Sequence, residues 1–379
     1  MTRVAFYISS HGFGHAAREV EVINALGPRL DAAGVDSRIQ IRSAVSPWLL
    51  ERTLRVPYEL HPLLCDPGLA QINSVTHDDL RTIRETTEFY ATFAARIEAE
   101  VHAIDRSEIG VIVGDIPPLA FAVADRIGVP SVAIGNFLWD WIYEGYPALL
   151  AQAPGVVPAI RAAYATATTG LRLPFAGDFS ALPRVTNIPL IARHGTRSRE
   201  DTRAALGLPL DRRIALLSFG GYGLPSLDVA GLNCLDDWSI VVTDRSLSEA
   251  ADARPAAVHH VPERAFIDRG VRYEDLVGAA DAVVSKPGYG IVAECIAAGT
   301  PLVYTSRGAF REYDVFVDQM PRYLRCTFIT QEDLFAGRWR AALDAVLRQP
   351  PPPLSIATNG AEVAADAILG VLTHVRDQT

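Results

Sequence analysis

Short apolar runs alternate with longer segments of helical spacing along the first half of the chain. Four runs have the length and β-branched content of buried strands: Val4–Ser9, Arg38–Ser43, Gly110–Gly114 and Ser131–Ile134. Three segments between them space their apolar residues as helices do: Ala16–Leu26, Asp78–Ile104 and Leu119–Arg126. Gly27-Pro28 predicts the end of the first helix, because glycine and proline stop helices. The alternation indicates parallel strands joined by crossover helices.

The same alternation starts again in the second half of the chain. Four further strands are predicted: Arg213–Ser218, Ser239–Thr243, Asp281–Ser285 and Pro301–Thr305. Helices are predicted over Ile291–Ala298 and Asn359–Arg376. Proline, glycine and arginine break the periodicity over Pro183–Arg199, so we expect a first α/β domain over 1–187 and a second over 188–354. Residues 355–379 would form a C-terminal helix, with the first domain as its candidate packing surface.

Length and charge narrow the functional classes. A chain of 379 residues suits two α/β domains better than one core. The net charge of −9 argues against a nucleic-acid partner, since nucleic acids need a basic surface. The sequence holds no charged leader and no apolar run of the ~18 residues that a membrane span needs. Its cysteines are widely separated and lack metal-ligand spacing. We therefore expect a cytoplasmic protein with reduced thiols and no membrane span.

The loop after the first predicted strand, Ser9 to His15, carries candidate acid–base chemistry. Its glycines, Gly14 among them, let the backbone approach a ligand closely. Its two histidines, His11 and His15, are suited to proton transfer near neutral pH. The alternative is that both histidines cap or pack locally. Asp115 ends another predicted strand, where it could orient a histidine or contact an acceptor, or serve only as a turn or N-cap carboxylate.

Glycine-rich turns follow two strands of the second half. Gly220, Gly221 and Tyr222 come after the strand ending at Ser218, where small residues can form an anion-binding nest. The turn over Ser285–Gly290 opens a helix, whose free amides suit phosphate oxygens; its candidate binding residues are Lys286, Gly288, Tyr289 and Gly290. Glu294 would lie one turn into that helix, where a carboxylate can accept hydrogen bonds from ribose hydroxyls. This pattern is typical of a nucleotide-sugar site.

Two further segments offer candidate contacts. The aromatic run over 135–143 follows a strand, and its Asn136, Trp139 and Asp140 suit a sugar or a flat acceptor. The equal alternative is a packed aromatic helix start. After the strand Pro301–Thr305, Glu312 could bind donor-sugar hydroxyls, and Arg307 or Arg311 could contact phosphate.

Motifs of several other chemistries are missing from the sequence. It has no HExxH, no Walker A loop, no serine nucleophile elbow and no Asp-x-Asp pair for a metal-bound diphosphate. We therefore expect neither a metal nor a required cofactor, with Lys286 offsetting the charge of a diphosphate.

Together these segments resemble the GT-B glycosyltransferases over nearly the whole chain. The loops Gly12–His15 and Ser285–Pro301 are similar to those of the peptidoglycan N-acetylglucosaminyltransferase group. The resemblance is stronger to the glycosyltransferase-like N-terminal part of plant L-arabinokinase, and the shared segments are His11–Ala16, Asn136–Asp140, Phe219–Gly221 and Lys286–Gly290. The sugar-kinase part of that protein has no counterpart here, so kinase activity is not implied. The resemblance implies two Rossmann-like, doubly wound domains that face a cleft.

The resemblance also implies a function. A nucleotide diphosphate sugar, such as a UDP-sugar, would bind the second domain and a small-molecule acceptor the first. His15 maps to the base, with His11 as its neighbouring candidate, and Glu294 maps to the ribose carboxylate. Direct displacement would invert the sugar carbon. Two alternatives stay open: a nucleotide-sugar epimerase of the same fold, and a non-catalytic protein that binds nucleotide sugars.

Overall fold

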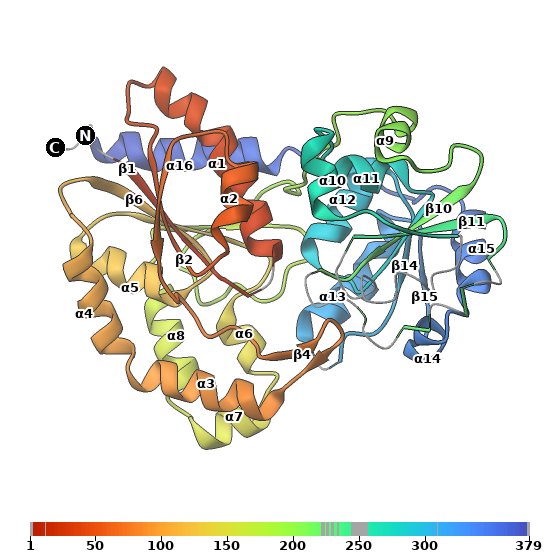
Figure 1. Cartoon of the computed structure of the whole chain (residues 1–379). Helices are drawn as coiled ribbons and strands as arrows, with labels where there is room; N and C mark the ends of the chain where they lie inside the picture. The colour runs from red at the N-terminus through yellow and green to blue at the C-terminus, as the bar shows by residue number, and fades with distance from the viewer. Residues whose placement is uncertain are drawn as a thin grey trace.

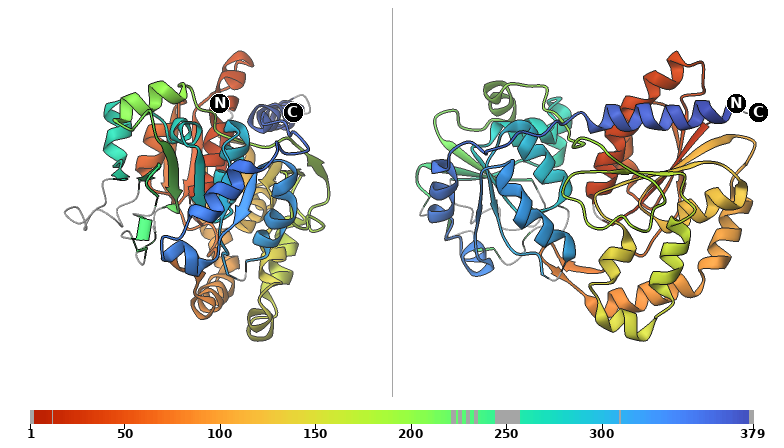
Figure 2. Two further views of the ribbon diagram at one scale, coloured as in Figure 1. Left: turned by 90° about the vertical axis from the view of Figure 1, so that its right-hand side faces the viewer. Right: turned by 180° about the vertical axis from the view of Figure 1, so that it is seen from behind.

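Two all-parallel sheets organise the chain and lie side by side, each flanked by helices (Figures 1 and 2). The computed structural model describes residues 3–376 except 12, 221–223, 225, 226, 229, 230, 233, 234, 244–256 and 309. The central strands of both sheets are short and mainly apolar, as expected where helices cover both sides of a parallel sheet, whereas the edge strands over 58–62 and 185–187 have no buried residue. In β6 (Ile109–Asp115), for example, every residue is buried.

The first sheet has seven strands and the second has six. In spatial order the first is β3 (Tyr58–Pro62), β2 (Ile39–Ser43), β1 (Arg3–Ile8), β6, β7 (Ser131–Gly135), β8 (Thr169–Arg172) and β9 (Val185–Asn187). The second is β12 (Val258–His260), β11 (Trp238–Val242), β10 (Arg213–Ser218), β13 (Ala282–Ser285), β14 (Leu302–Tyr304) and β15 (Cys326–Phe328). A two-stranded hairpin stands apart: β4 (Gln71–Asn73) and β5 (Thr76–His77).

Helices connect and cover these strands. In the first half they are α1 (Phe13–Ala32), α2 (Pro47–Thr53), α3 (Asp79–Ala91), α4 (Phe93–Ala103), α5 (Pro118–Ile127), α6 (Trp139–Tyr143), α7 (Pro147–Gln152) and α8 (Val156–Tyr164). In the second half they are α9 (Arg199–Leu206), α10 (Glu263–Asp268), α11 (Tyr273–Ala279), α12 (Tyr289–Ala298), α13 (Arg311–Gln319), α14 (Gln331–Phe335), α15 (Arg340–Arg348) and α16 (Gly360–Arg376), with a 3-10 turn over Met320–Arg322.

Each sheet reverses its strand order at one point, and these points position the site. In the first sheet the chain winds outward from β1 to β3 and then returns to place β6 on the other side of β1. In the second sheet it winds from β10 to β12 and returns to place β13 beside β10. Ligands of doubly wound sheets bind where the order reverses, at the carboxyl ends of the strands. The histidine loop and Asp115 lie at the first point, and Gly220 and Lys286 lie at the second.

Two predicted helix boundaries are wrong. The first helix does not stop at Gly27-Pro28, because α1 continues through both residues to Ala32. Leu26 and Leu30, on either side, are fully buried, and this packing outweighs the cost of an interior proline. A side chain at Gly27 would lie 2.2 Å from Cγ1 of Val56, so close packing requires the glycine. The predicted helix over Asp78–Ile104 is divided at Thr92 into α3 and α4.

Two segments join the halves of the molecule. The terminal helix α16 lies along α1, and Arg29 Nε donates to Asp366 Oδ1 at 2.5 Å (Figure 2). The β4–β5 hairpin reaches from the first half toward the second sheet (Figure 1). Val75 at its turn is buried in the apolar core of the second sheet, and Ser74 Oγ donates to the Phe219 carbonyl at 2.6 Å. The limits 1–187, 188–354 and 355–379 stay a prediction.

Candidate active site

A histidine and a carboxylate meet at the first reversal point. His15 lies in the first turn of α1 and Asp115 is the last residue of β6, next to β1 in the sheet. The Nδ1 atom of His15 lies 2.8 Å from Oδ1 of Asp115, and the two residues are 7% and 1% exposed. Helix α5 has Pro117 as its N-cap, so Asp115 does not cap it.

Arg18 stabilises the ionised carboxylate of Asp115. Its guanidinium donates to both oxygens of Asp115, from Nε at 3.0 Å and from Nη2 at 2.5 Å. Burial alone would raise the pKa of Asp115, but the charges and hydrogen bonds of Arg18 and His15 outweigh burial and lower it. Arg18 Nη2 also lies 3.2 Å from Nδ1 of His15. The ionised Asp115 is the nearer partner, at 2.8 Å, and favours the tautomer with the proton on Nδ1, which leaves the Nε2 lone pair free to accept a proton.

His11 has the opposite tautomer. The backbone N–H of Leu69 donates to its Nδ1 at 3.2 Å, so neutral His11 carries its proton on Nε2. This approach depends on Gly68, which has φ +60° and whose Cβ would lie 3.0 Å from the imidazole. Burial, followed by the charge of Arg307, lowers the pKa of His11 well below its usual value. His11 is therefore a neutral hydrogen-bond donor, and His15 is the acceptor.

A chain of hydrogen bonds links this point to the second half of the molecule. Arg18 Nη1 donates to Asn136 Oδ1 at 3.0 Å, and Asn136 Nδ2 donates to Glu312 Oε1 at 2.7 Å. Arg307 Nη1 then donates to Glu312 Oε2 at 2.9 Å. Four candidate residues from distant parts of the sequence, Asp115, Asn136, Glu312 and Arg307, thus belong to one buried network.

At the second reversal point the candidate binding groups are mainly backbone amides. Gly288 is the N-cap of α12 and makes no side-chain cap, so the first amides of the helix have no such partner. A Cβ on Gly288 would lie 3.9 Å from Nη1 of Arg307, which places that cation at the helix start. Burial, then Arg307, lowers the pKa of the nearby Lys286 to about 7. Gly220 has φ +70°, whereas Gly221 and Tyr222 lie outside the described residues.

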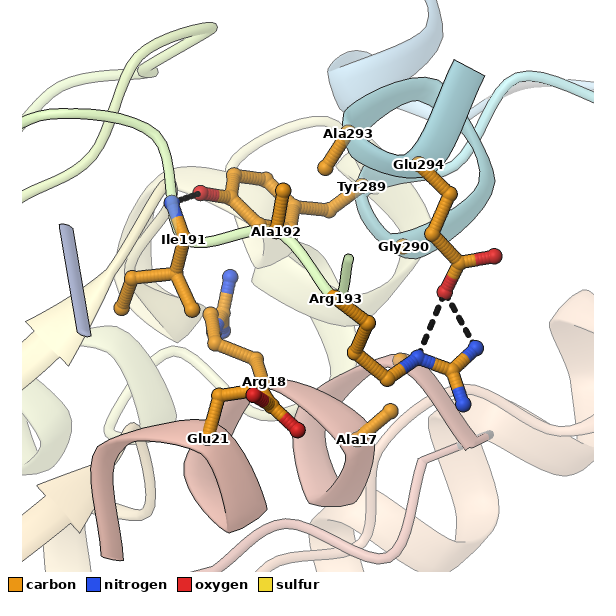
Figure 3. A pocket seen from close by; sticks show the side chains of 11 residues that line it. Ala17, Arg18, Glu21, Ile191, Ala192, Arg193, Tyr289, Gly290, Ala293 and Glu294 are labelled. Atoms are coloured by element: carbon orange, nitrogen blue, oxygen red, sulfur yellow. Dashed lines mark hydrogen bonds and ion pairs between the residues drawn. The ribbon is translucent and has the colours of Figure 1, made fainter. Parts of the chain in front are cut away.

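Helices α1 and α12 face each other, and Glu294 lies at their contact (Figure 3). Arg193 donates from both Nε, at 2.7 Å, and Nη2 to Oε1 of Glu294. The space that Gly14, Tyr289, Gly290 and Glu294 help to line is about 10 Å³, enough for one water. A second cavity of about 200 Å³ opens on the other side of Arg193 and Glu294. A ribose that binds Glu294 would have to use its second oxygen or displace Arg193.

Comparisons with known proteins bear on this arrangement. No family model matches the chain. L-arabinokinase of Arabidopsis thaliana is 28% identical over 370 residues, 95% of this chain but 33% of that protein, so the chain spans about a third of this relative. An uncharacterised glycosyltransferase of Methanopyrus kandleri is 23% identical over 80% of this chain and 89% of its own length.

Solved structures match the whole chain. The calicheamicin glycosyltransferase CalG4 superposes with a TM-score of 0.61, at 14% identity over 100% of this chain and 97% of its own. The glycosyltransferase VinC in complex with dTDP gives 0.58 at 17% identity over 100% of both chains. The chain has the GT-B fold. The predicted class, two Rossmann-like parallel sheets, is thereby confirmed, and the halves are called the N-terminal and C-terminal lobes below.

Two predicted acceptor residues of the GT-B N-terminal lobe are buried in its core. Trp139 is fully buried, stacks on Tyr143 with ring centroids 5.4 Å apart, and donates from Nε1 to Asp66 at 3.1 Å. Asp140 is 1% exposed and pairs with Arg161 at 2.9 Å. These two residues fit the alternative, a packed aromatic helix start. Asn136 differs, since it belongs to the network that crosses between the lobes.

Several residues of this GT-B site carry no motif that the sequence analysis used. Arg18 follows His15 by three positions, the spacing that places both on one face of α1, so helical spacing could have found it. Arg193 lies in the predicted interdomain segment, and only the fold brings it to Glu294. His77 lies on a short hairpin that the apolar pattern does not predict.

No group of three His, Cys, Asp or Glu side chains among the described residues is arranged to hold a metal ion. No described helix is long and apolar enough to cross a membrane.

Proposed function

We propose that the protein is a glycosyltransferase that moves a sugar from a nucleotide diphosphate sugar to a small hydroxyl acceptor. One observation carries the proposal: His15, paired with Asp115, lies in the first turn of α1, the helix that faces the N-terminus of α12. A base and an anion-binding helix end on opposite walls are what direct displacement at a sugar carbon requires. The GT-B fold and the glycosyltransferases that share it support this assignment.

The reaction follows from the tautomer of His15. Its Nε2 takes the proton of the acceptor hydroxyl while the acceptor oxygen forms a bond to the anomeric carbon. The bond from that carbon to the diphosphate oxygen breaks, and the nucleoside diphosphate leaves with its electron pair. Asp115 stabilises the imidazolium that forms, and attack opposite the leaving group inverts the sugar carbon. No metal takes part in this scheme.

The C-terminal lobe would hold the donor. The amides at the start of α12, near Gly288 and Gly290, would bind the diphosphate, with Lys286 and Arg307 offsetting its charge. Gly220, which follows β10, would add a backbone amide to this site. Glu312 would accept from hydroxyls of the transferred sugar, because Asn136 and Arg307 fix both of its oxygens in place.

A thermal-shift panel of UDP-, GDP-, dTDP- and ADP-sugars tests donor binding. A ligand at 100 times its Kd stabilises the folded protein by about 2.7 kcal/mol, so one nucleotide should raise Tm by several degrees. With that donor and a panel of small hydroxyl acceptors, His15→Ala should lower the rate of nucleoside diphosphate release by about 10²–10⁴-fold while Kd changes little. Full turnover in His15→Ala would show that His15 is not the base.

The donor alone separates the remaining alternatives. An epimer formed without acceptor, seen by NMR, would identify an isomerase. Tight binding with no release of nucleoside diphosphate across the acceptor panel would identify a binding protein. A panel in which no nucleotide sugar shifts Tm would contradict the proposed function.

A further inference from the structure

Three nitrogen-bearing side chains surround the buried ring of Phe310 between the lobes, and a fourth, Lys286, lies close enough to affect them electrostatically. Arg307 places its guanidinium carbon 4.2 Å from the centroid of Phe310, and the rings of His77 and His11 lie 5.7 and 6.3 Å from that centroid. Lys286 acts electrostatically on both histidines and is itself affected by Arg307. His11, His77, Lys286 and Arg307 are called the nitrogen cluster here.

Three side-chain nitrogens of the cluster have no hydrogen-bond partner in the described part of the chain. Nε2 of His11, Nδ1 of His77 and Nε of Arg307 are buried and have no hydrogen-bond partner among the described residues. Arg307 is only 7% exposed, so water does not readily satisfy its Nε. Glu312 is the carboxylate that offsets Arg307, and it is already bound by Asn136 and Arg307. The cluster therefore has unused capacity for an oxyanion.

The cluster lies where the proposed diphosphate would bind. Nη1 of Arg307 is close to Gly288, the N-cap of α12, and lies 3.4 Å from the Pro287 carbonyl. The hairpin that carries His77 contacts the same region from the other lobe: Ser74 Oγ donates to the carbonyl of Phe219, the residue before Gly220. A Cβ on Gly308 would lie 3.9 Å from Nδ1 of His77, so the loop after β14 contacts the hairpin as well.

We infer that His77, carried across by the β4–β5 hairpin, binds the diphosphate of the donor and takes up a proton when it does so. The inference rests on the proposed function and adds a residue of the N-terminal lobe to the donor site. Protonated His77 would stabilise the departing nucleoside diphosphate together with Lys286 and Arg307.

The charges around His77 determine whether donor affinity rises or falls with pH. Burial, then Arg307, then Lys286 lower its pKa to about 4 in the free protein. The other ionisable groups around it are His11, across Phe310, and Glu312, which pairs with Arg307. A bound diphosphate reverses the local charge and raises the pKa of His77. The complex then binds more protons than the free protein does, so donor affinity should rise as pH falls from about 8 toward 5.5.

Titration calorimetry with the nucleotide sugar that gives the largest thermal shift tests the inference. Such a sugar is a phosphodiester with no protonation step of its own in this range. Measured at pH 6 in two buffers of different ionisation enthalpy, the wild type should take up part of a proton. His77→Gln should bind about 10-fold more weakly, since a charge-assisted hydrogen bond is lost, and should take up fewer protons. The pKa of Lys286, about 7, adds proton uptake above pH 6 in both proteins, so the difference between them isolates His77.

His102→Gln is the matched control, because His102 is exposed on α4 and should behave as the wild type. If His77→Gln lowers Tm, His77→Asn provides a second variant with the same expected loss of proton uptake. Equal affinity and equal proton uptake in wild type and His77→Gln would overturn the role of His77 and leave the proposed function standing. Absence of binding by the wild type to every nucleotide sugar would overturn both.

Discussion

The two reversal points occupy equivalent places in their sheets, but side chains form one of them and mainly backbone groups form the other. In the N-terminal lobe, side chains dominate: His15, Asp115 and Arg18 lock one another through short hydrogen bonds. In the C-terminal lobe, glycine and free helix amides dominate, and Nε of the nearby Arg307 has no hydrogen-bond partner among the described residues. The first point is complete without a ligand, whereas the second is not. In the proposed function, the first point carries the base and the second binds the diphosphate of the donor.

The largest expected effect comes from removing the carboxylate of Asp115 at the first reversal point. In Asp115→Asn the amide no longer holds the Nδ1–H tautomer of His15, and Arg18 loses its buried partner. We expect the rate of nucleoside diphosphate release to fall at least about 100-fold, approaching the loss in His15→Ala, with donor Kd nearly unchanged. Asp125→Asn, an exposed change on α5, is the control. A variant with wild-type turnover would show that the His15–Asp115 pair is structural.

The pattern of apolar residues predicted the parts of the fold on which this comparison depends. It found β1, β6, β10 and β13, because buried parallel strands are short apolar runs, and it found the glycine turns that follow them. It did not find Arg18 as the partner of Asp115 or His77 as a neighbour of Lys286. These pairs are 97 and 209 positions apart, and only the strand order and the hairpin bring them together. The early end predicted for α1 failed because Leu26 and Leu30, on either side of the exposed Pro28, are buried in the core, and local propensity does not record this packing.

A second effect concerns Asp66, a buried carboxyl group next to the first reversal point, and the pH dependence of stability. Asp66 is 2% exposed and accepts from Ser9 Oγ at 3.0 Å, beneath the histidine loop, and from Trp139. Burial raises its pKa from 3.8 to about 6. The folded state therefore holds this proton more tightly than the unfolded state does, and stability is lost as pH rises from about 4 through 6. At about 1.4 kcal/mol per pKa unit, the loss is about 3 kcal/mol.

Asp66→Asn mimics the protonated acid and should remove this part of the pH dependence. Urea unfolding at pH 5 and pH 7.5 should show that the unfolding free energy of the wild type falls more than that of Asp66→Asn over this interval. At pH 7.5 the variant should be the more stable of the two. Parallel pH dependences in the two proteins would contradict the raised pKa.

The smallest expected effect is on donor affinity at the second reversal point, from a change at Gly288. Gly288 has φ −158°, which any residue can adopt, and a Cβ there would meet only Arg307 Nη1 at 3.9 Å. Gly288→Ala should therefore leave Tm nearly unchanged. If a phosphate lies against this amide, the added methyl group should weaken donor binding by about 10-fold, with little effect on the rate at saturation. Unchanged donor affinity would show that the diphosphate lies elsewhere.

The most direct test of the account is the structure of the protein with an intact nucleotide sugar bound. We expect diphosphate oxygens within hydrogen-bond distance of the amides at Gly288–Gly290. We also expect the anomeric carbon of the sugar to face Nε2 of His15 across the lobes. His15 should keep its contact with Asp115 in the complex. A nucleotide sugar found instead in the cavity beside Arg193 and Glu274, with its sugar remote from His15, would contradict the account.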